Sequence, residues 1–283
     1  LMMLLSIREW YMDRKKLINQ SIDYIMKHLD ENLSLDTVAA HFFISKYHFS
    51  RIFKEETGES VYAFIKRCKI DMKLNPAKAI TDIGLDYGYS ASNYSSVFRQ
   101  HHDTPPSMFR QSIPTRSMSL PFSSERIVHF KTAEEYTAQI EVQKQEDLFV
   151  LYERFIGTYA DLEKNWYQFL DKYKDFLNEK TLLVERFFND PAITSPLQCI
   201  CDICMTVEPD CGLSNVMRIS GGQWIVYHFD GKIKDIFETL EGIFSVWFPQ
   251  SGYKMTRRYG LNIYRRFDRD NHSVIMDLYI PIS

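Results

Sequence analysis

Apolar residues between positions 34 and 54 recur at helical spacing in two short runs. The runs consist of Leu35, Val38, Ala39 and Phe42, and of Phe49, Ile52 and Phe53. Ser34 precedes the first run and Ser45 the second, where a hydroxyl can accept from the free N–H groups of a helix start. The pattern predicts two short helices joined by a tight turn. The outer side of the second helix is polar and basic, which suits contact with phosphates.

A similar pattern returns between residues 79 and 100, which read AITDIGLDYGYSASNYSSVFRQ. One helical stripe contains Ile80, Ile83 and Tyr87, and Gly88 interrupts it. Serines then precede a second stripe, which contains Tyr94, Val97 and Phe98. With amphipathic helices over residues 8–32 and 60–70, the sequence predicts an all-α first domain, residues 1–112, with two helix-turn-helix units in tandem.

Residues 113–125 are rich in Ser and Pro and have no period, which predicts a linker. Beyond it, residues 126–283 contain an internal repeat. Residues 150–152 lead to Gly157 and residues 225–227 to Gly231, and each glycine is followed by apolar residues at positions +5, +9, +12 and +16. Two strand-like segments follow each helix, at 182–188 and 199–207, and at 259–264 and 272–282. We predict an α+β domain of two β-α-β-β repeats in one curved sheet, with a ligand cleft between its halves.

Composition is that of an ordinary globular protein. The chain has 283 residues, of which 45% are hydrophobic and 25% charged, enough for two domains with separate cores. No apolar run approaches membrane-spanning length, so we expect a cytoplasmic protein without a membrane partner. The net charge is −3, but residues 1–116 carry 16 Lys and Arg against 13 Asp and Glu, and the remainder 18 against 24. A basic front half suits contact with nucleic acid.

Four of the five cysteines, Cys199, Cys201, Cys204 and Cys211, lie close together in the sequence. Crowded thiolates could hold zinc or sense oxidants. In a strand, however, Cys199 and Cys201 share one face while Cys204 lies on the other. We therefore interpret them as buried strand residues and predict no metal site and no cofactor.

Several motifs of the front half stand in a recognisable order: Gly58-Glu-Ser60, Ile80-Thr-Asp-Ile83, Gly88-Tyr89, Phe98-Arg99 and Thr104-Pro-Pro-Ser-Met-Phe109-Arg110. In these residues the chain resembles the AraC/XylS family of transcription regulators. The resemblance implies DNA contacts from Lys46, Tyr47, Ser50, Arg51 and Lys54 in the first unit, and from Ser90, Ser92, Asn93, Ser96 and Arg99 in the second. Arg51 is the expected base reader, because a guanidinium can pair with guanine O6 and N7.

The segment between the two units departs from that family. Only residues 69–74 precede Asn75-Pro76, which is shorter than the linking helix of AraC-like proteins. The loss of one turn would move the reading helices by roughly 5 Å and rotate one against the other. Either their spacing is compressed or a segment has been lost from the chain, and we favour the second interpretation.

A second set of motifs lies in the rear half: residues 152–159, Asn189-Asp-Pro191, Thr194-Ser-Pro196, Cys199-Ile-Cys-Asp202, Gly221-Gly222, Ser251-Gly-Tyr253 and residues 277–281. They are similar to the GyrI-like effector-binding domain family, of the Rob/BmrR type. The candidate ligand-binding residues are Tyr152, Trp224, Tyr227, Trp247, Asn262, Tyr264 and Asp277. Family members that take cationic drugs place a glutamate where this chain has Asn262. We therefore expect the fixed negative charge to be missing and the ligand to be neutral, partly aromatic or lipophilic.

Together these features predict a sequence-specific transcription regulator, an activator by resemblance. Its partners would be double-stranded promoter DNA, a small-molecule effector and, as the resemblance implies, RNA polymerase. Two alternatives remain for the rear domain, namely binding of a protein partner or hydrolysis of a small molecule. Glu153 and Asp277 are available for hydrolysis, but strand alternation puts Glu153 on the face opposite Tyr152. We predict no enzyme and no catalytic residue.

Overall fold

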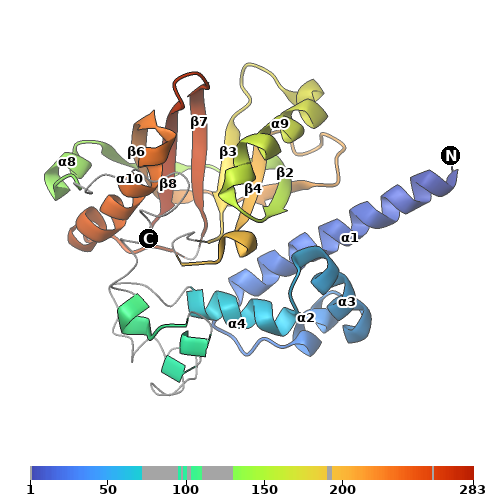
Figure 1. Ribbon diagram of the computed structural model, residues 1–283. Coiled ribbons are helices and arrows are strands. Elements are labelled where there is room, and N and C mark those ends of the chain that lie inside the picture. Colours follow the sequence, from blue (N-terminus) through green and yellow to red (C-terminus); the bar gives the residue numbers. More distant parts are fainter. Residues whose placement is uncertain are drawn as a thin grey trace. The chain divides into compact units, whose positions relative to one another are not determined.

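The computed structural model describes residues 2–71, 95–96, 98–100, 103–109, 130–189, 193–256 and 258–283. The chain divides into two compact units, Leu1–Gln111 and Ser112–Ser283 (Figure 1). Helices make up the described part of the first unit, and an antiparallel sheet with helices makes up the second. None of the described helices combines the length and the apolar character needed to cross a membrane.

Four helices are described at the start of the first unit: α1 (Met2–Lys27), α2 (Leu35–His41), α3 (Lys46–Thr57) and α4 (Val61–Asp71). The predicted helix starts are confirmed. Ser34 Oγ accepts from the N–H of Thr37 at 3.1 Å, and Ser45 Oγ accepts from the N–H of His48 at 3.4 Å. Gly58 ends α3 in the left-handed conformation, with φ of 79°, which glycine adopts without strain.

Buried side chains from all four helices hold α3 in place. Its Phe49 and Phe53 are fully buried, and the ring of Phe53 packs edge-on against Phe64 of α4 at 5.4 Å. Arg14 of α1 adds ion pairs to Glu55 at 2.7 Å and to Glu56 at 2.9 Å, near the end of α3. The helix is therefore fixed on its apolar side, which leaves its other side available.

Most of the second predicted helix-turn-helix unit lies outside the described residues, as do the linker 113–125 and the segment that joins the two units. Within the described part of this region, Phe98 and Phe109 are buried and pack edge to face at 5.4 Å.

The second unit is built on an eight-stranded sheet, counted over the described residues, with strand order β1-β6-β8-β7-β3-β4-β2-β5 and antiparallel pairing throughout. The strands are β1 (Ile140–Gln145), β2 (Leu148–Ile156), β3 (Leu183–Phe187), β4 (Ile200–Thr206), β5 (Val216–Ile219), β6 (Gly222–Lys232), β7 (Gly260–Asp268) and β8 (Ser273–Pro281). The six strands predicted from the pattern are confirmed. Strands β1 and β5 were not predicted.

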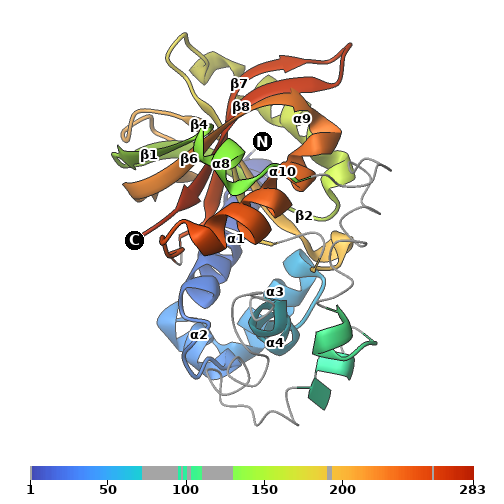
Figure 2. The same cartoon turned by 90° about the vertical axis from the view of Figure 1, so that its left-hand side faces the viewer.

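One face of the sheet is covered by α9 (Leu162–Tyr173), α10 (Ile236–Gly242) and the π-helical turn Ile243–Trp247, and α8 (Ala133–Thr137) packs beside them (Figure 2). Phe169 and Tyr173 of α9 pack on Ile203 of β4, in one hydrophobic cluster. Ile243 and Trp247 pack on β6 and β8 in another. We call this side the helix-covered face. Short 3₁₀ turns connect the elements at Tyr159–Asp161, Lys174–Phe176, Pro196–Gln198, Ile233–Asp235 and Phe248–Gln250.

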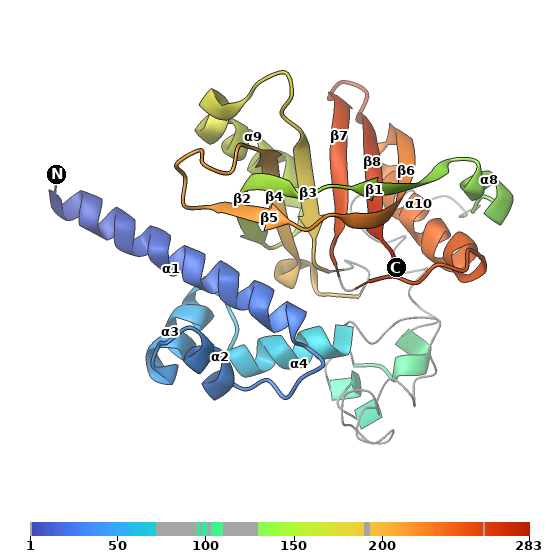
Figure 3. The same ribbon diagram turned by 180° about the vertical axis from the view of Figure 1, so that it is seen from behind.

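The opposite face is crossed by a ribbon, formed where β1 runs into β2 and β5 runs into β6 (Figure 3). Gln145 pairs with Gly222 before the bend and Leu148 with Ile219 after it, so the two long segments pair on both sides. Gly221 is required at this bend, because a Cβ there would lie 2.3 Å from the carbonyl oxygen of Gln145. We call this side the ribbon face.

The interpretation as buried strand residues is confirmed for Cys201 and Cys204 in β4, and Cys199 is buried directly before that strand. It is wrong for Cys211, which is half-buried and lies outside the strands. Cys199 and Cys201 pack around Tyr159, whereas Cys204 belongs to the cluster on the ribbon face. Burial raises the pKa of the Cys201 and Cys204 thiols well above the usual range, which disfavours thiolate chemistry. Within the described ranges, no three His, Cys, Asp or Glu residues gather in a way that could hold a metal ion.

Candidate functional sites

Helix α3 presents its polar side to solvent, as the sequence predicts. Of the residues expected to contact DNA in the first unit, Lys46, Tyr47, Arg51 and Lys54 are exposed and Ser50 is half-buried. The ring of Tyr47 is 80% exposed on this side of the helix. The fold thus brings the five residues to one accessible side of one helix.

Two of these side chains already have partners. Arg51 Nη2 lies 3.3 Å from Nδ1 of His48, one turn earlier on the same helix. Lys46 Nζ lies 2.9 Å from the carboxylate of Asp36 in α2. Because both pairs are exposed, their charges remain available to a polyanion.

Sequence reasoning did not single out Phe43, which lies in the turn between α2 and α3. It is 98% exposed and has a φ of 55°, which is uncommon for a residue with a side chain of this size. The sequence offered one signal, an apolar residue at the break between two helical stripes. Its ring is an exposed apolar group in the turn that precedes α3.

In the second unit, Ser90, Ser92 and Asn93 lie outside the described residues. Ser96 and Arg99 are both exposed, on either side of the buried Phe98. The DNA contacts expected from this unit therefore remain predictions.

The seven candidate ligand-binding residues are divided between the two faces of the sheet. Tyr227 and Trp247 belong to the cluster on the helix-covered face, and Tyr264 packs against it. Asn262 shares that face, because it lies two residues from Tyr264 on β7. Tyr152 and Trp224 belong to the ribbon-face cluster together with Tyr279, and Asp277 lies two residues from Tyr279 on β8. A cleft on one face of the sheet can therefore contact only some of these seven residues.

Sequence reasoning missed Glu185, which pairs directly with Asn262 across β3 and β7. Its carboxyl group is fully buried and accepts hydrogen bonds from Nε1 of Trp166 at 2.5 Å and from Nδ2 of Asn262 at 3.4 Å. The structure thus places a buried carboxyl group beside Asn262, and the expectation of a neutral, partly aromatic or lipophilic ligand stays a prediction. A glutamate in the middle of the apolar segment LLVERFF was the available signal.

The environment of Glu185 controls its charge. Burial raises the pKa of the Glu185 carboxyl to about 7, against the opposing effect of hydrogen bonds from Trp166, Tyr264 and Asn262. Burial and the nearby glutamate also raise the pKa of Tyr264 well above its usual range. A carboxyl group with a pKa near neutrality changes its charge with small changes in its surroundings.

Other buried charges are balanced by ion pairs. Asp202 lies between Arg154 at 2.7 Å and Arg186 at 2.5 Å. Burial alone would raise the pKa of Asp202, but the two guanidinium groups outweigh it and lower the pKa. Asp277 likewise accepts from Nε of Arg265 at 2.8 Å and contacts Nδ1 of His228 at 2.7 Å. Asp277, a candidate ligand contact, is thus committed to an ion pair.

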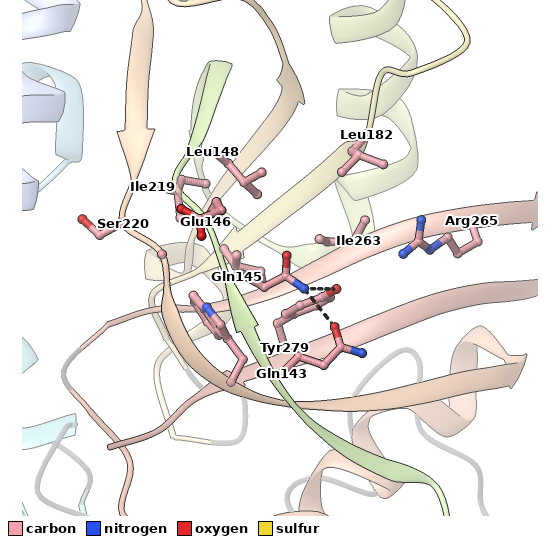
Figure 4. Close-up of a pocket in the computed structure, with 13 residues that line it drawn as sticks. Gln143, Gln145, Glu146, Leu148, Leu182, Ile219, Ser220, Ile263, Arg265 and Tyr279 are labelled. Carbon is pink, nitrogen blue, oxygen red and sulfur yellow. Dashed lines mark hydrogen bonds between the residues drawn. The ribbon is translucent and has the colours of Figure 1, made fainter.

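A pocket of about 190 Å³ lies on the ribbon face, between the ribbon and the middle of the sheet (Figure 4). Its lining combines apolar side chains with a group of polar ones. The lining includes Gln143, Gln145, Glu146, Leu182, Trp224, Leu261, Ile263, Arg265 and Tyr279. Of the seven candidates, Trp224 is the one that lines this pocket.

Comparison with family models divides the chain as its fold does. A model described as a GyrI-like small molecule binding domain matches residues 138–283. A helix-turn-helix domain model matches residues 38–112. The first match covers the whole sheet, and the second begins within α2.

Curated relatives resemble the front part of the chain. The transcriptional regulator Rob of Salmonella typhimurium is 33% identical over 107 residues, which are 36% of this chain and 37% of that protein. The regulatory protein SoxS of Escherichia coli is 31% identical over 104 residues, which are 35% of this chain and 97% of SoxS. The chain thus spans little more than a third of the length of Rob. Among solved structures, the EcmrR C-terminal domain is 11% identical with a TM-score of 0.44, and the match covers 51% of this chain and 97% of that one.

Proposed function

The chain belongs to the GyrI-like small molecule binding domain family and carries an AraC-type helix-turn-helix domain in front of it, and from this premise we propose that it is a transcription regulator controlled by a small molecule. The front unit binds promoter DNA, and the rear unit binds the effector. An effector acts only to the extent that it binds the DNA-bound and free forms with different affinities. Activation through RNA polymerase is the step that the family resemblance adds.

The observation that carries the proposal is the geometry of α3. Phe49, Ile52 and Phe53 anchor the helix in the core, so that Arg51 and Lys54 project from a fixed backbone. A rigid helix with basic and polar residues on its outer side is the element that enters a major groove. Arg51 is the side chain that we expect to read bases, and Lys46 and Lys54 are expected to contact phosphates.

For the effector, we propose recognition on the helix-covered face around Glu185, Asn262 and Tyr264. In support, these residues lie on β3 and β7, the two strands that pair at the middle of the sheet. The strand order reads β7-β8-β6 outward on one side and β3-β4-β2 on the other. We infer that this order reflects two β-α-β-β repeats, whose corresponding third elements meet where Glu185 and Asn262 pair.

Selection of binding sites from random duplex DNA tests the proposed function. We expect the wild-type chain to enrich a defined sequence, with an affinity that falls steeply as salt rises. Arg51→Ala should lose discrimination at one base pair, by about 1–3 kcal/mol, and keep salt-dependent binding. Arg269→Ala is the matched control, because it removes the same charge from an exposed site on the sheet domain, where Arg269 lies 3.4 Å from Glu163.

Two results would count against this assignment. If the wild-type chain enriches no sequence, the proposed regulator function is wrong. If Arg51→Ala enriches the same sequence with the same base preferences as Arg269→Ala, DNA binding stands but Arg51 does not read bases.

A further inference from the structure

The pocket on the ribbon face is separate from the region around Glu185. It lies on the other side of the sheet, and residues from the ribbon and from β7 and β8 line it. Neither the DNA-binding helix nor the Glu185 group contributes to it. The ligand of this pocket must therefore be inferred from its own lining.

Trp224 supplies the most specific feature of this lining. Its side chain is only 2% exposed, and among the described residues its indole Nε1 has no hydrogen-bond partner. By contrast, Nε1 of Trp166 donates to Glu185, and Nε1 of Trp247 donates to Thr137 at 2.9 Å. A buried donor without an acceptor is unfavourable, so a ligand that supplies the acceptor binds more tightly.

The other polar groups of the lining are amides and a phenol. Gln145 Nε2 donates to Gln143 Oε1 at 2.9 Å and lies 3.5 Å from Oη of Tyr279 (Figure 4). Amides both donate and accept, so this side matches a neutral amide or carbonyl group. The charges around the lining disfavour an anion. Glu146 is exposed there, Arg265 is paired with Asp277 at 2.7 Å, and Arg258 beside Trp224 already donates to the carbonyl oxygens of Gly221 and Gln223.

The remaining lining restricts the size and the polarity of the ligand. Leu182, Leu261 and Ile263 are apolar, and the ring of Trp224 is stacked by the guanidinium of Arg258 at 4.4 Å. The volume of about 190 Å³ slightly exceeds that of an engineered apolar cavity of ~150 Å³ that holds benzene. One aromatic ring with a small polar substituent fits this space.

We propose that the pocket on the ribbon face is a second small-molecule site, which takes neutral single-ring aromatic amides or ketones whose carbonyl oxygen accepts from Nε1 of Trp224. The ring packs against the leucine side chains, and the remaining polar atoms of the ligand meet Gln143 and Gln145. Binding here needs neither DNA nor an occupied Glu185 region.

Three probes of nearly the same shape test the proposal on the full chain: benzamide, benzoate and benzamidine. The chain has four tryptophans, so the indole N–H signals in a ¹⁵N-correlated NMR spectrum form a small set. The Trp224 signal is identified by its loss in Trp224→Phe. We expect benzamide to move this signal downfield. Benzoate, which meets Glu146, and benzamidine, which lacks an acceptor, should bind at least several-fold more weakly.

Two variants test the contacts by calorimetry. Trp224→Phe removes the N–H and keeps a ring. Compared with the wild type, its affinity for benzamide should fall about two- to tenfold more than its affinity for toluene, which accepts no hydrogen bond. Leu182→Phe fills the pocket and should abolish binding of both compounds. Leu197→Phe is its matched control, because Leu197 is exposed and lies outside the pocket lining.

The outcomes are decisive in either direction. A Trp224 signal that benzamide leaves unmoved, equal binding of benzamidine, or unchanged binding in Leu182→Phe would each overturn the proposal. If Trp224→Phe fails to fold, Leu182→Phe together with the three probes still decides. Loss of DNA binding in these experiments would bear on the proposed regulator function and would leave the pocket assignment untouched.

Discussion

Glu185 shows how one carboxyl group can be tolerated in the interior of a sheet. Its oxygens receive hydrogen bonds from Trp166 and Asn262, which offset part of the cost of burial. The pKa of about 7 reflects the part that remains. At acidic pH the carboxyl is neutral in the folded chain, and its ionisation near neutral pH opposes folding.

Substitution of Glu185 should change how stability depends on pH. The folded-state pKa of about 7 lies above the pKa of 4.5 that is usual for a glutamate in an unfolded chain. Below pH 4.5 the carboxyl is protonated in both states, so its burial leaves the free energy of unfolding unaffected by pH. As pH rises from 4.5 to about 7, the carboxyl ionises in the unfolded chain but not in the folded one, so the free energy of unfolding falls. Over this window the free energy of unfolding of the wild type should fall by about 3 kcal/mol relative to Glu185→Gln.

Urea denaturation at a series of pH values measures this difference. Glu208→Gln, at an exposed position after β4, serves as the control and should follow the wild type. Parallel pH profiles for the wild type and Glu185→Gln would show that the carboxyl is not held in its neutral form.

The candidate ligand-binding residues mark the limit of residue-level prediction. Within one strand, alternation tells which residues share a face, and it correctly separates Glu153 from Tyr152. It does not tell which face of one strand continues which face of the next. That information lies in the pairing register, such as Glu185 opposite Asn262, and the sequence does not reveal the register of strands far apart in the chain.

At the level of elements, strong periodicity and capping residues were sufficient to predict helix ends and six of the strands. Ser34, Ser45 and Gly58 mark helix ends where the sequence placed them, and six strands follow their apolar patterns. Strand β1 reads IEVQKQ and has no fully buried residue, and β5 has only four residues. Their place in the sheet comes from pairing with β6 and β2, so local apolar patterns give little indication of them.

The ribbon depends on the backbone geometry of its bend. In Gly221→Ala, the new Cβ would lie 2.3 Å from the carbonyl oxygen of Gln145 and 2.7 Å from the carbonyl carbon of Glu146, and backbone atoms cannot rotate away. We expect the free energy of unfolding to fall by about 1–3 kcal/mol, measured by thermal or urea denaturation. Gly260→Ala is the matched control in β7, where the nearest atom is 3.5 Å from the added Cβ. Equal stabilities of the two variants would show that the ribbon adjusts without cost.

At the level of the whole molecule, the sequence predicted two domains from a change of pattern, and the described residues divide in the same way. The basic residues predominate in the first 116 residues and the acidic ones in the remainder. This separation suits a chain in which one unit meets a polyanion and the other meets a small molecule. The precise boundaries at residues 112 and 126 stay predictions, because the residues between them lie outside the described ranges.

The sheet domain should fold without the front unit. Each strand of the sheet finds its partners within residues 140–281, and the clusters on both faces also use residues from this segment together with α8. We expect the fragment 126–283, produced alone, to unfold cooperatively and to keep the β-rich circular dichroism of the sheet. The fragment 126–270 is the control. It lacks β8, which pairs with both β6 and β7, and should therefore remain unfolded. A fragment 126–283 that fails to fold in the same buffer as the stable full chain would mean that the front unit supplies part of the stability of the sheet, and that the two units do not act as separate modules.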